Sequence, residues 1–76
     1  MFREHERIVL KSDVPGEGLR AGDVGTVVHV YRDGQAYEIE FVKLDGRTAA
    51  VVTLNADSVR RINSREITHA REMATR

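Results

Sequence analysis

The chain of 76 residues contains no cysteine, no tryptophan and a single proline. Without cysteine it cannot form disulfide bonds or thiolate metal sites, and such a composition is typical of a reducing compartment. Twelve basic and twelve acidic residues cancel, so no net charge attracts nucleic acid over a long range. The bulk charge therefore does not predict a nucleic acid partner, which would need a local basic patch.

Long hydrophobic runs are also missing. Residues 1–7 are mostly charged, and no apolar stretch approaches the ~20 residues of a membrane span. The length allows one domain, near the lower limit at which a chain buries enough apolar surface to fold alone. We expect a small cytoplasmic domain with no membrane contact.

Glycine is present at positions that predict turns. Asp33-Gly34 and Asp45-Gly46 flank the β-forming run 37–42. An Asp-Gly pair between β-formers is typical of a hairpin, because a two-residue primed turn needs positive φ at both central residues. The sequence thus predicts a meander of three strands over 23–31, 37–42 and 47–54.

Two short strands complete the predicted fold. Residues 7–11 and 58–62 have strand character, and the glycine-rich segment 12–22 predicts a long first loop. Five strands within about 62 residues have the size of a small open barrel. We therefore expect an all-β domain over residues 1–62.

The period of two indicates which side chains face inward. In the third strand Tyr37, Ile39 and Phe41 share one face, and Val28 and Leu54 are expected to join them in the core. Gly25 predicts a bend or a close backbone approach. The opposite face is expected to carry an apolar strip made of Val9, Val27, Val42, Ala49 and Val51.

Residues 63–76 change character. Asn63 and Glu66 have the spacing of a capping box, and a narrow apolar stripe follows at helical spacing. The stripe consists of Ile67, Ala70, Met73 and Ala74. We expect a short amphipathic C-terminal helix. A helix of this length is not stable alone in water, so it must dock on its own barrel, on a second copy of the chain or on another protein.

Residues with chemical potential are scattered. His5, His29 and His69 lack the spacing of metal ligands. Glu38 and Glu40 would hold carboxylates about 7 Å apart, within reach of glycosidase geometry, but any solvated strand face gives the same spacing. We predict no catalytic residue, no metal, no cofactor and no enzymatic activity.

The same blocks support a resemblance. Gly18-Leu19, residues 22–28, the strand 37–41 and the Asp45-Gly46 turn leading to 52–54 together resemble a widespread bacterial family of short SH3-like proteins of unknown function, over about residues 5–62. A dozen residues around 22–28 also resemble translation-type SH3-like modules that bind ribosomal RNA and the barrel of the nitrile hydratase β subunit. The resemblance implies a five-stranded SH3-like barrel with a short C-terminal helical extension, and no mechanism.

These observations predict a non-enzymatic protein-binding module or adaptor, for which the bacterial family suggests an antitoxin- or immunity-like role. The partner is another protein or a second copy, bound through Ala49, Val51, Ile67, Ala70 and Met73. One alternative is an RNA-binding accessory protein that uses the densest basic residues, Arg47, Arg60, Arg61 and Arg65. The other alternative is a small subunit of an enzyme complex.

Overall fold

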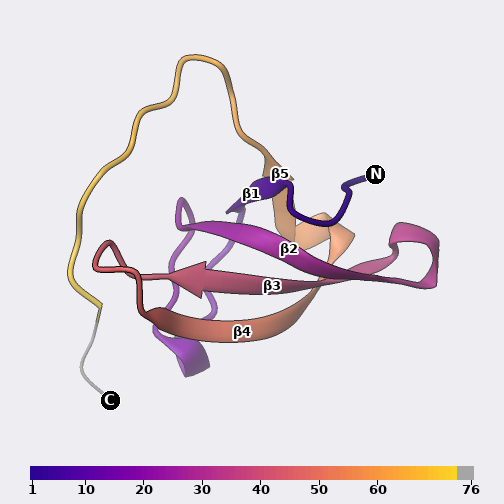
Figure 1. Ribbon diagram of the computed structural model, residues 1–76, viewed down its shortest axis with the longest axis horizontal. Helices are drawn as coiled ribbons and strands as arrows, with labels where there is room; N and C mark the ends of the chain where they lie inside the picture. The colour runs from indigo at the N-terminus through magenta and orange to yellow at the C-terminus, as the bar shows by residue number, and fades with distance from the viewer. Residues whose placement is uncertain (74–76) are drawn as a thin grey trace.

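Five antiparallel strands form one sheet in the computed structural model, which describes residues 1–73 (Figure 1). The strands are β1 (Arg7–Leu10), β2 (Val24–Tyr31), β3 (Ala36–Val42), β4 (Thr48–Asn55) and β5 (Val59–Arg61). Their order in the sheet is β4-β3-β2-β1-β5. The predicted meander and all-β class are confirmed. β4 and β5 lie at opposite edges and are not hydrogen-bonded to each other, so the sheet is open.

Short 3-10 turns occupy three of the connections. They are η1 (Pro15–Glu17), η2 (Arg32–Gly34) and η3 (Ala56–Ser58). In η2 both Asp33 and Gly34 have positive φ, as predicted, but Arg32 does too, and the four residues 32–35 separate β2 from β3 in place of the predicted two. In the second hairpin Asp45 does not have positive φ, and three residues form the turn between Lys43 and Arg47: the Lys43 N–H donates to the Arg47 carbonyl oxygen, and the Gly46 N–H donates to the Lys43 carbonyl oxygen. This is the pattern of a type I turn followed by a left-handed glycine.

Substitution of Gly34 or Gly46 tests this turn chemistry. Gly46 has a φ of 92°, and no atom lies within 4 Å of the position that a Cβ would take, so Gly46→Ala should cost about 1 to 2 kcal/mol from backbone strain alone. Gly34→Ala should cost more, because its Cβ would also displace Met1 and press on the Tyr37 hydroxyl. Urea melts would measure both. Two variants that unfold at the wild-type midpoint would contradict the assignment.

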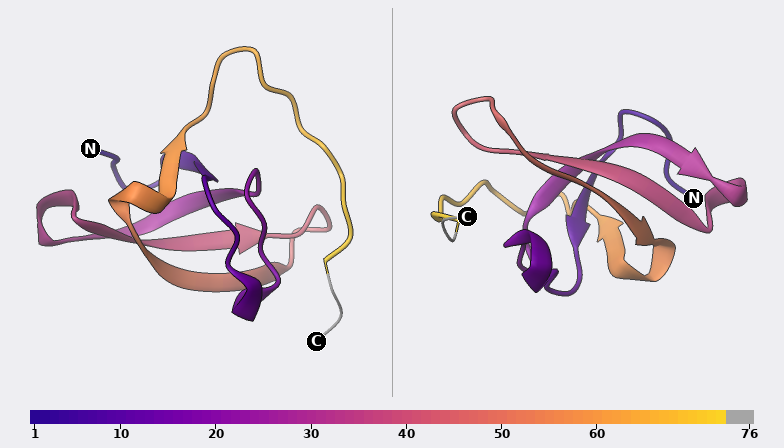
Figure 2. Two further views of the ribbon diagram at one scale, coloured as in Figure 1. Left: turned by 180° about the vertical axis from the view of Figure 1, so that it is seen from behind. Right: turned by 90° about the horizontal axis from the view of Figure 1, so that it is seen from below.

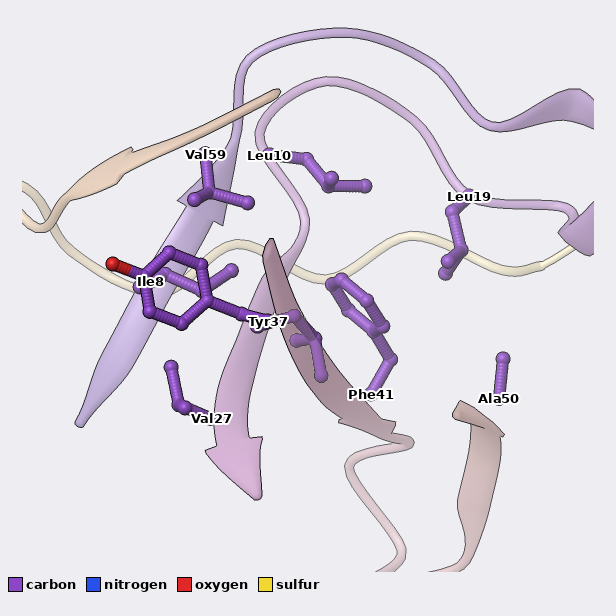
Figure 3. Close-up of a cluster of buried hydrophobic side chains, with 9 residues drawn as sticks. Ile8, Leu10, Leu19, Val27, Tyr37, Phe41, Ala50 and Val59 are labelled. Carbon is purple, nitrogen blue, oxygen red and sulfur yellow. The ribbon is translucent and has the colours of Figure 1, made fainter. Parts of the chain in front are cut away.

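The core lies on one face of the sheet and is closed by the first loop (Figure 3). Phe41 pairs with Gly25 on one side and with Ala50 on the other, so a large side chain sits between two small ones. Gly25 makes the close approach that the sequence predicted: its Cβ would lie 2.5 Å from Ile39 Cγ2. The buried cluster comprises Ile8, Leu10, Leu19, Val27, Tyr37, Ile39, Phe41, Ala50 and Val59.

The predicted phase of β2 is wrong. Val27, assigned to the outer strip, is fully buried, whereas Val28, assigned to the core, is 38% exposed. The inward position before Val27 is Gly25, which has no side chain to reveal the phase. A β-bulge between Val27 and His29 then shifts the register, so that Val30 packs against the core three residues later. Leu54 is half-buried and packs against the cluster.

Val9 lies on the outer face, as predicted, but it is buried there. β1 lies between β2 and β5, and Val9 pairs directly with Val24 on one side and Arg60 on the other. Directly paired residues share a face of the sheet, so these two side chains flank Val9. The N-terminal segment is ordered as well: the Phe2 N–H donates to the Tyr37 hydroxyl at 3.0 Å, and the two rings meet edge to face.

The predicted C-terminal helix is wrong over residues 63–73, which form one turn and then an extended arch (Figure 2). The capping-box hydrogen bond does form, since the Asn63 N–H donates to Glu66 Oε1 at 2.7 Å. However, the Glu66 carboxylate is also held by Arg60, and Arg71 is bonded to Asp23 far along the chain. These side-chain bonds hold the backbone extended. Helix nucleation is unfavourable in a short segment, and no helical packing contact compensates its free-energy cost here. Residues 74–76, and with them Ala74, lie outside the described residues.

Candidate functional site

β4 is a long sheet edge that carries no charge and no proline, although a β-bulge interrupts its pairing at Ala49, between the pairs Phe41–Ala50 and Val42–Thr48. It is eight residues long and pairs only with β3. Its sequence, Thr48–Asn55, contains no charged residue and no proline. Natural sheets protect their edges with short strands, charges, prolines or bulges, because an unpaired edge is a template for another strand. β5 has such protection: it is three residues long and two of them are arginines.

Exposed valines lie on the outer face beside this edge. Val24, Val42 and Val51 are each between 44% and 50% exposed, and we call them the valine patch. The pair Gly25 and Phe41 places Val24 and Val42 next to each other on β2 and β3, and Val51 lies on β4 opposite Glu40. Of the predicted strip, Val42 and Val51 are therefore exposed. Ala49 is half-buried and packs against the core.

Polar side chains continue this face toward the β2–β3 hairpin. The Tyr31 hydroxyl donates to Glu38 Oε1 at 3.3 Å, and the Thr48 hydroxyl donates to Glu40 Oε2 at 2.6 Å. Partial loss of solvent and the negative charge of Glu38 raise the pKa of Tyr31. Both glutamates thus bond to hydroxyls on an open strand face. A shallow hollow of about 300 Å³ is lined by Tyr31, and another of about 190 Å³ lies at the first loop, but neither glutamate lines either of them.

The four arginines proposed for RNA do not meet. Arg60 forms two hydrogen bonds with Glu66, and Arg61 pairs with Glu6 at 2.5 Å and stacks on the Phe2 ring. Both belong to β5, whereas Arg47 precedes β4 at the other edge of the sheet. The fourth predicted basic residue, Arg65, is exposed beside the Asn63 turn. Arg47 Nε also lies 3.9 Å from Asp45 Oδ2, so three of the four charges are already paired with carboxylates.

The tail docks at the first loop rather than on β4. Arg71 Nε and Nη2 donate to the two carboxylate oxygens of Asp23 at 2.9 and 2.5 Å, and Nη2 also donates to the Gly18 carbonyl oxygen. Met73 is half-buried and packs against the core cluster. The two other predicted contact residues of the tail, Ile67 and Ala70, are exposed. No local sequence pattern predicts this contact, because Arg71 and Asp23 are 48 residues apart.

Two carboxylates of the tail contacts have a lowered pKa. Burial raises the pKa of Asp23, but hydrogen bonds from Arg71 and from the Arg20 N–H outweigh it and lower the value overall. Glu66 has a pKa of about 2, because the Arg60 side chain and the Asn63 N–H both donate to its carboxylate. Both groups are therefore charged at neutral pH.

Arg60→Ala should raise the pKa of Glu66 back toward its ordinary value of 4.5. In the wild type, the stabilisation from this pair is complete above the ordinary pKa and is lost as the pH falls toward about 2. An NMR titration of the Glu66 side-chain carboxyl carbon would measure the shift. Arg65→Ala is the matched control, since its backbone N–H, not its side chain, makes the bond to Asn63. An unchanged titration in Arg60→Ala would refute the assigned cause.

The histidines remain dispersed. His29 lies 4.0 Å from Glu4 and stacks edge to face on Tyr31, while His5 and His69 are exposed. Across residues 1–73, no group of three His, Asp or Glu side chains has the arrangement of a metal site. In the same part of the chain, no helix is long and apolar enough to cross a membrane.

Comparison with known proteins gives one match. Residues 4–61 match the model of a family described as a domain of unknown function (DUF4926). Neither a curated protein nor a solved structure matches the chain. The matched segment contains all five strands and ends with β5, so it excludes the turn and the arch that follow. Because the match covers well over half of the sequence, the chain belongs to this DUF4926 family.

Proposed function

We propose that this chain is a non-enzymatic protein-binding module that accepts a β-strand of a partner protein along the free edge of β4. The observation that carries the proposal is that edge: eight residues without a charge or a proline, paired on one side only. In strand addition, main-chain hydrogen bonds supply affinity and alternate side chains supply specificity. The proposal includes an SH3-like classification of the open sheet and a cytoplasmic location.

The partner strand should be apolar on one face. Val51 is 50% exposed on β4, and Val42 and Val24 extend the apolar surface over the next two strands. A strand added at the edge would place every second side chain on this outer face, next to the valine patch. An adaptor of an antitoxin- or immunity-like kind, which binds one dedicated protein, would use such a surface.

Charges placed on β4 test the proposal. Val51→Lys and Thr53→Lys together should abolish capture of the partner by the tagged full chain, because lysine on an edge strand opposes further pairing. Both positions are exposed, so the free energy of unfolding should change by no more than about 0.5 kcal/mol per site. Affinity capture with quantitative mass spectrometry, and a melting curve for each variant, would measure the two effects.

The matched control adds two lysines elsewhere. Ser12→Lys with Gln35→Lys changes exposed residues of the first loop and of the β2–β3 hairpin, and it should keep the partner. Equal capture by the β4 variant and the control would contradict strand addition at β4. Capture that instead falls steeply with salt and depends on RNA would favour the RNA-binding alternative. If one enzyme always co-purifies with the chain, and the β4 variant loses it, the partner is an enzyme and this chain is its small subunit.

A further inference from the structure

A binding site for a guanidinium group lies where the first loop meets the start of β2. The Asp23 carboxylate and the Gly18 carbonyl oxygen converge on it, and the side chain of Arg71 fills it. The Arg71 and Asp23 side chains are only 23% and 19% exposed, less than those of any other ion pair among residues 1–73. A hollow of about 190 Å³ continues from it, lined by Asp13, Pro15, Gly18, Leu19, Arg20 and Arg71.

The backbone of the first loop is shaped for this contact. Gly18 ends η1 with a φ of 72°, which places it in the left-handed region and leaves its carbonyl oxygen free to accept from Arg71. Its lack of a side chain also leaves room for Met73, whose Cε lies 3.4 Å from the position that a Cβ would take. The site therefore recognises two features of the bound segment: the arginine at position 71, and the apolar side chain two residues later, Met73.

The segment that fills the site is attached by a spacer, residues 67–70, without polar contacts to the other described residues. No hydrogen bond or ion pair joins residues 67–70 to the other residues that the structure describes. Ile67 is 90% exposed, more than any other large hydrophobic side chain in that part of the chain. The spacer is part of the arch that follows β5 in Figure 1. The docked segment thus behaves as a ligand that is linked to the domain by the spacer. No polar contact of the spacer determines whether the segment binds the site of its own chain or that of a second chain.

We propose that the site also binds residues 71–73 of a second copy of the chain, so that two copies exchange their tails. Exchange of an identical segment reproduces every contact of the closed chain and closes with two-fold symmetry. The four spacer residues can extend by about 13 Å. In the exchanged pair the two spacers run past each other, which allows each Ile67 to leave water. The exchange uses neither the β4 edge nor the valine patch, so it stands apart from the proposed function.

A spin label on the tail tests the exchange in the full chain. Because the chain has no cysteine, Glu72→Cys provides a single attachment point, and Glu72 is exposed. Chains that carry the nitroxide but no ¹⁵N are mixed with ¹⁵N-labelled wild-type chains at millimolar concentration and followed until the spectrum is constant. We expect loss of the Gly18, Leu19 and Asp23 amide signals of the ¹⁵N chain. The Gly34 amide, in the hairpin at the other end of the sheet, should keep its intensity.

Intact Gly18, Leu19 and Asp23 signals in the mixture would overturn the proposal, provided that a chain carrying both labels loses them. Charge reversal gives an independent result. Asp23→Arg and Arg71→Asp chains should each be monomeric alone, and a mixture of the two should have the mass of a pair in light scattering, because only exchange reunites opposite charges. If the mixture stays monomeric while one chain bearing both substitutions regains the wild-type melting temperature, tails dock only within their own chain.

Discussion

Phe41→Ala is expected to remove a large part of the protein's stability. Phe41 is only 3% exposed, and its ring fills the space above two small partners, Gly25 and Ala50. Loss of such a ring costs about 3 to 5 kcal/mol. A chain of this length has a total stability of roughly 4 to 11 kcal/mol, so the variant loses much of it. Urea denaturation followed by far-UV circular dichroism would measure the loss.

A surface truncation provides the comparison for Phe41. Leu44→Ala removes a side chain that is 82% exposed in the β3–β4 turn, and it should shift stability by less than about 0.5 kcal/mol. A Phe41→Ala protein as stable as Leu44→Ala would show that the inward face of β3 has been misassigned.

Gly25→Ala is expected to destabilise the core through the addition of a single methyl group. The new Cβ would lie 2.5 Å from Ile39 Cγ2 and 2.8 Å from Phe41 Cε1. Neither side chain can move freely, because both are buried in the core. Overpacking of this kind costs about 1 to 3 kcal/mol, and Gly25→Val should exceed that range.

The matched control for Gly25 is Gly16→Ala. An added Cβ at Gly16 meets no atom within 4 Å, so the substitution should be neutral or slightly stabilising through the unfolded chain. Thermal melts of both variants would compare them directly. Similar melting temperatures for Gly25→Ala and Gly16→Ala would mean that β2 and β3 do not pack as closely at this point as the structure has them.

The strands could be predicted from sequence because their signals are local. Asp33-Gly34 and the alternation of β3 fix a hairpin and its inward face within a few residues. The phase of β2 could not be predicted in this way. Its inward position opposite Phe41 is a glycine, and the bulge after Val27 changes the alternation. The pattern of hydrophobic residues indicates neither the inward-facing glycine nor the bulge.

The tail shows a different limit. The Asn63 and Glu66 pattern correctly predicts a hydrogen bond between them, yet the helix that usually follows is not formed by residues 67–73. What decides the tail conformation is the bond between Arg71 and Asp23, which lie 48 residues apart. A periodic apolar stripe cannot reveal a partner at that distance. For the same reason, the sequence indicated an apolar contact at Met73 but left its surface open among its own barrel, a second copy and another protein, and the structure packs Met73 against the core cluster of its own chain.

The β4 edge depends both on local sequence signals and on contacts between segments that are distant in the sequence. Its length and position follow from local patterning, so Val51 could be predicted to face outward. Its status as an uncharged edge depends on the strand order, because the same segment would be ordinary in the middle of a sheet. Only the contrast with β5, which carries Arg60 and Arg61, makes the absence of charge on β4 informative.

Amide hydrogen exchange of the captured complex tests strand addition at β4 most directly. In the free chain, the β4 amides that do not bond to β3 should exchange rapidly. On binding, these amides should become the most strongly protected new set in the chain, because a partner strand accepts their hydrogen bonds. Unchanged exchange along Thr48–Asn55 in the complex, with new protection on β5 or the first loop instead, would contradict the account.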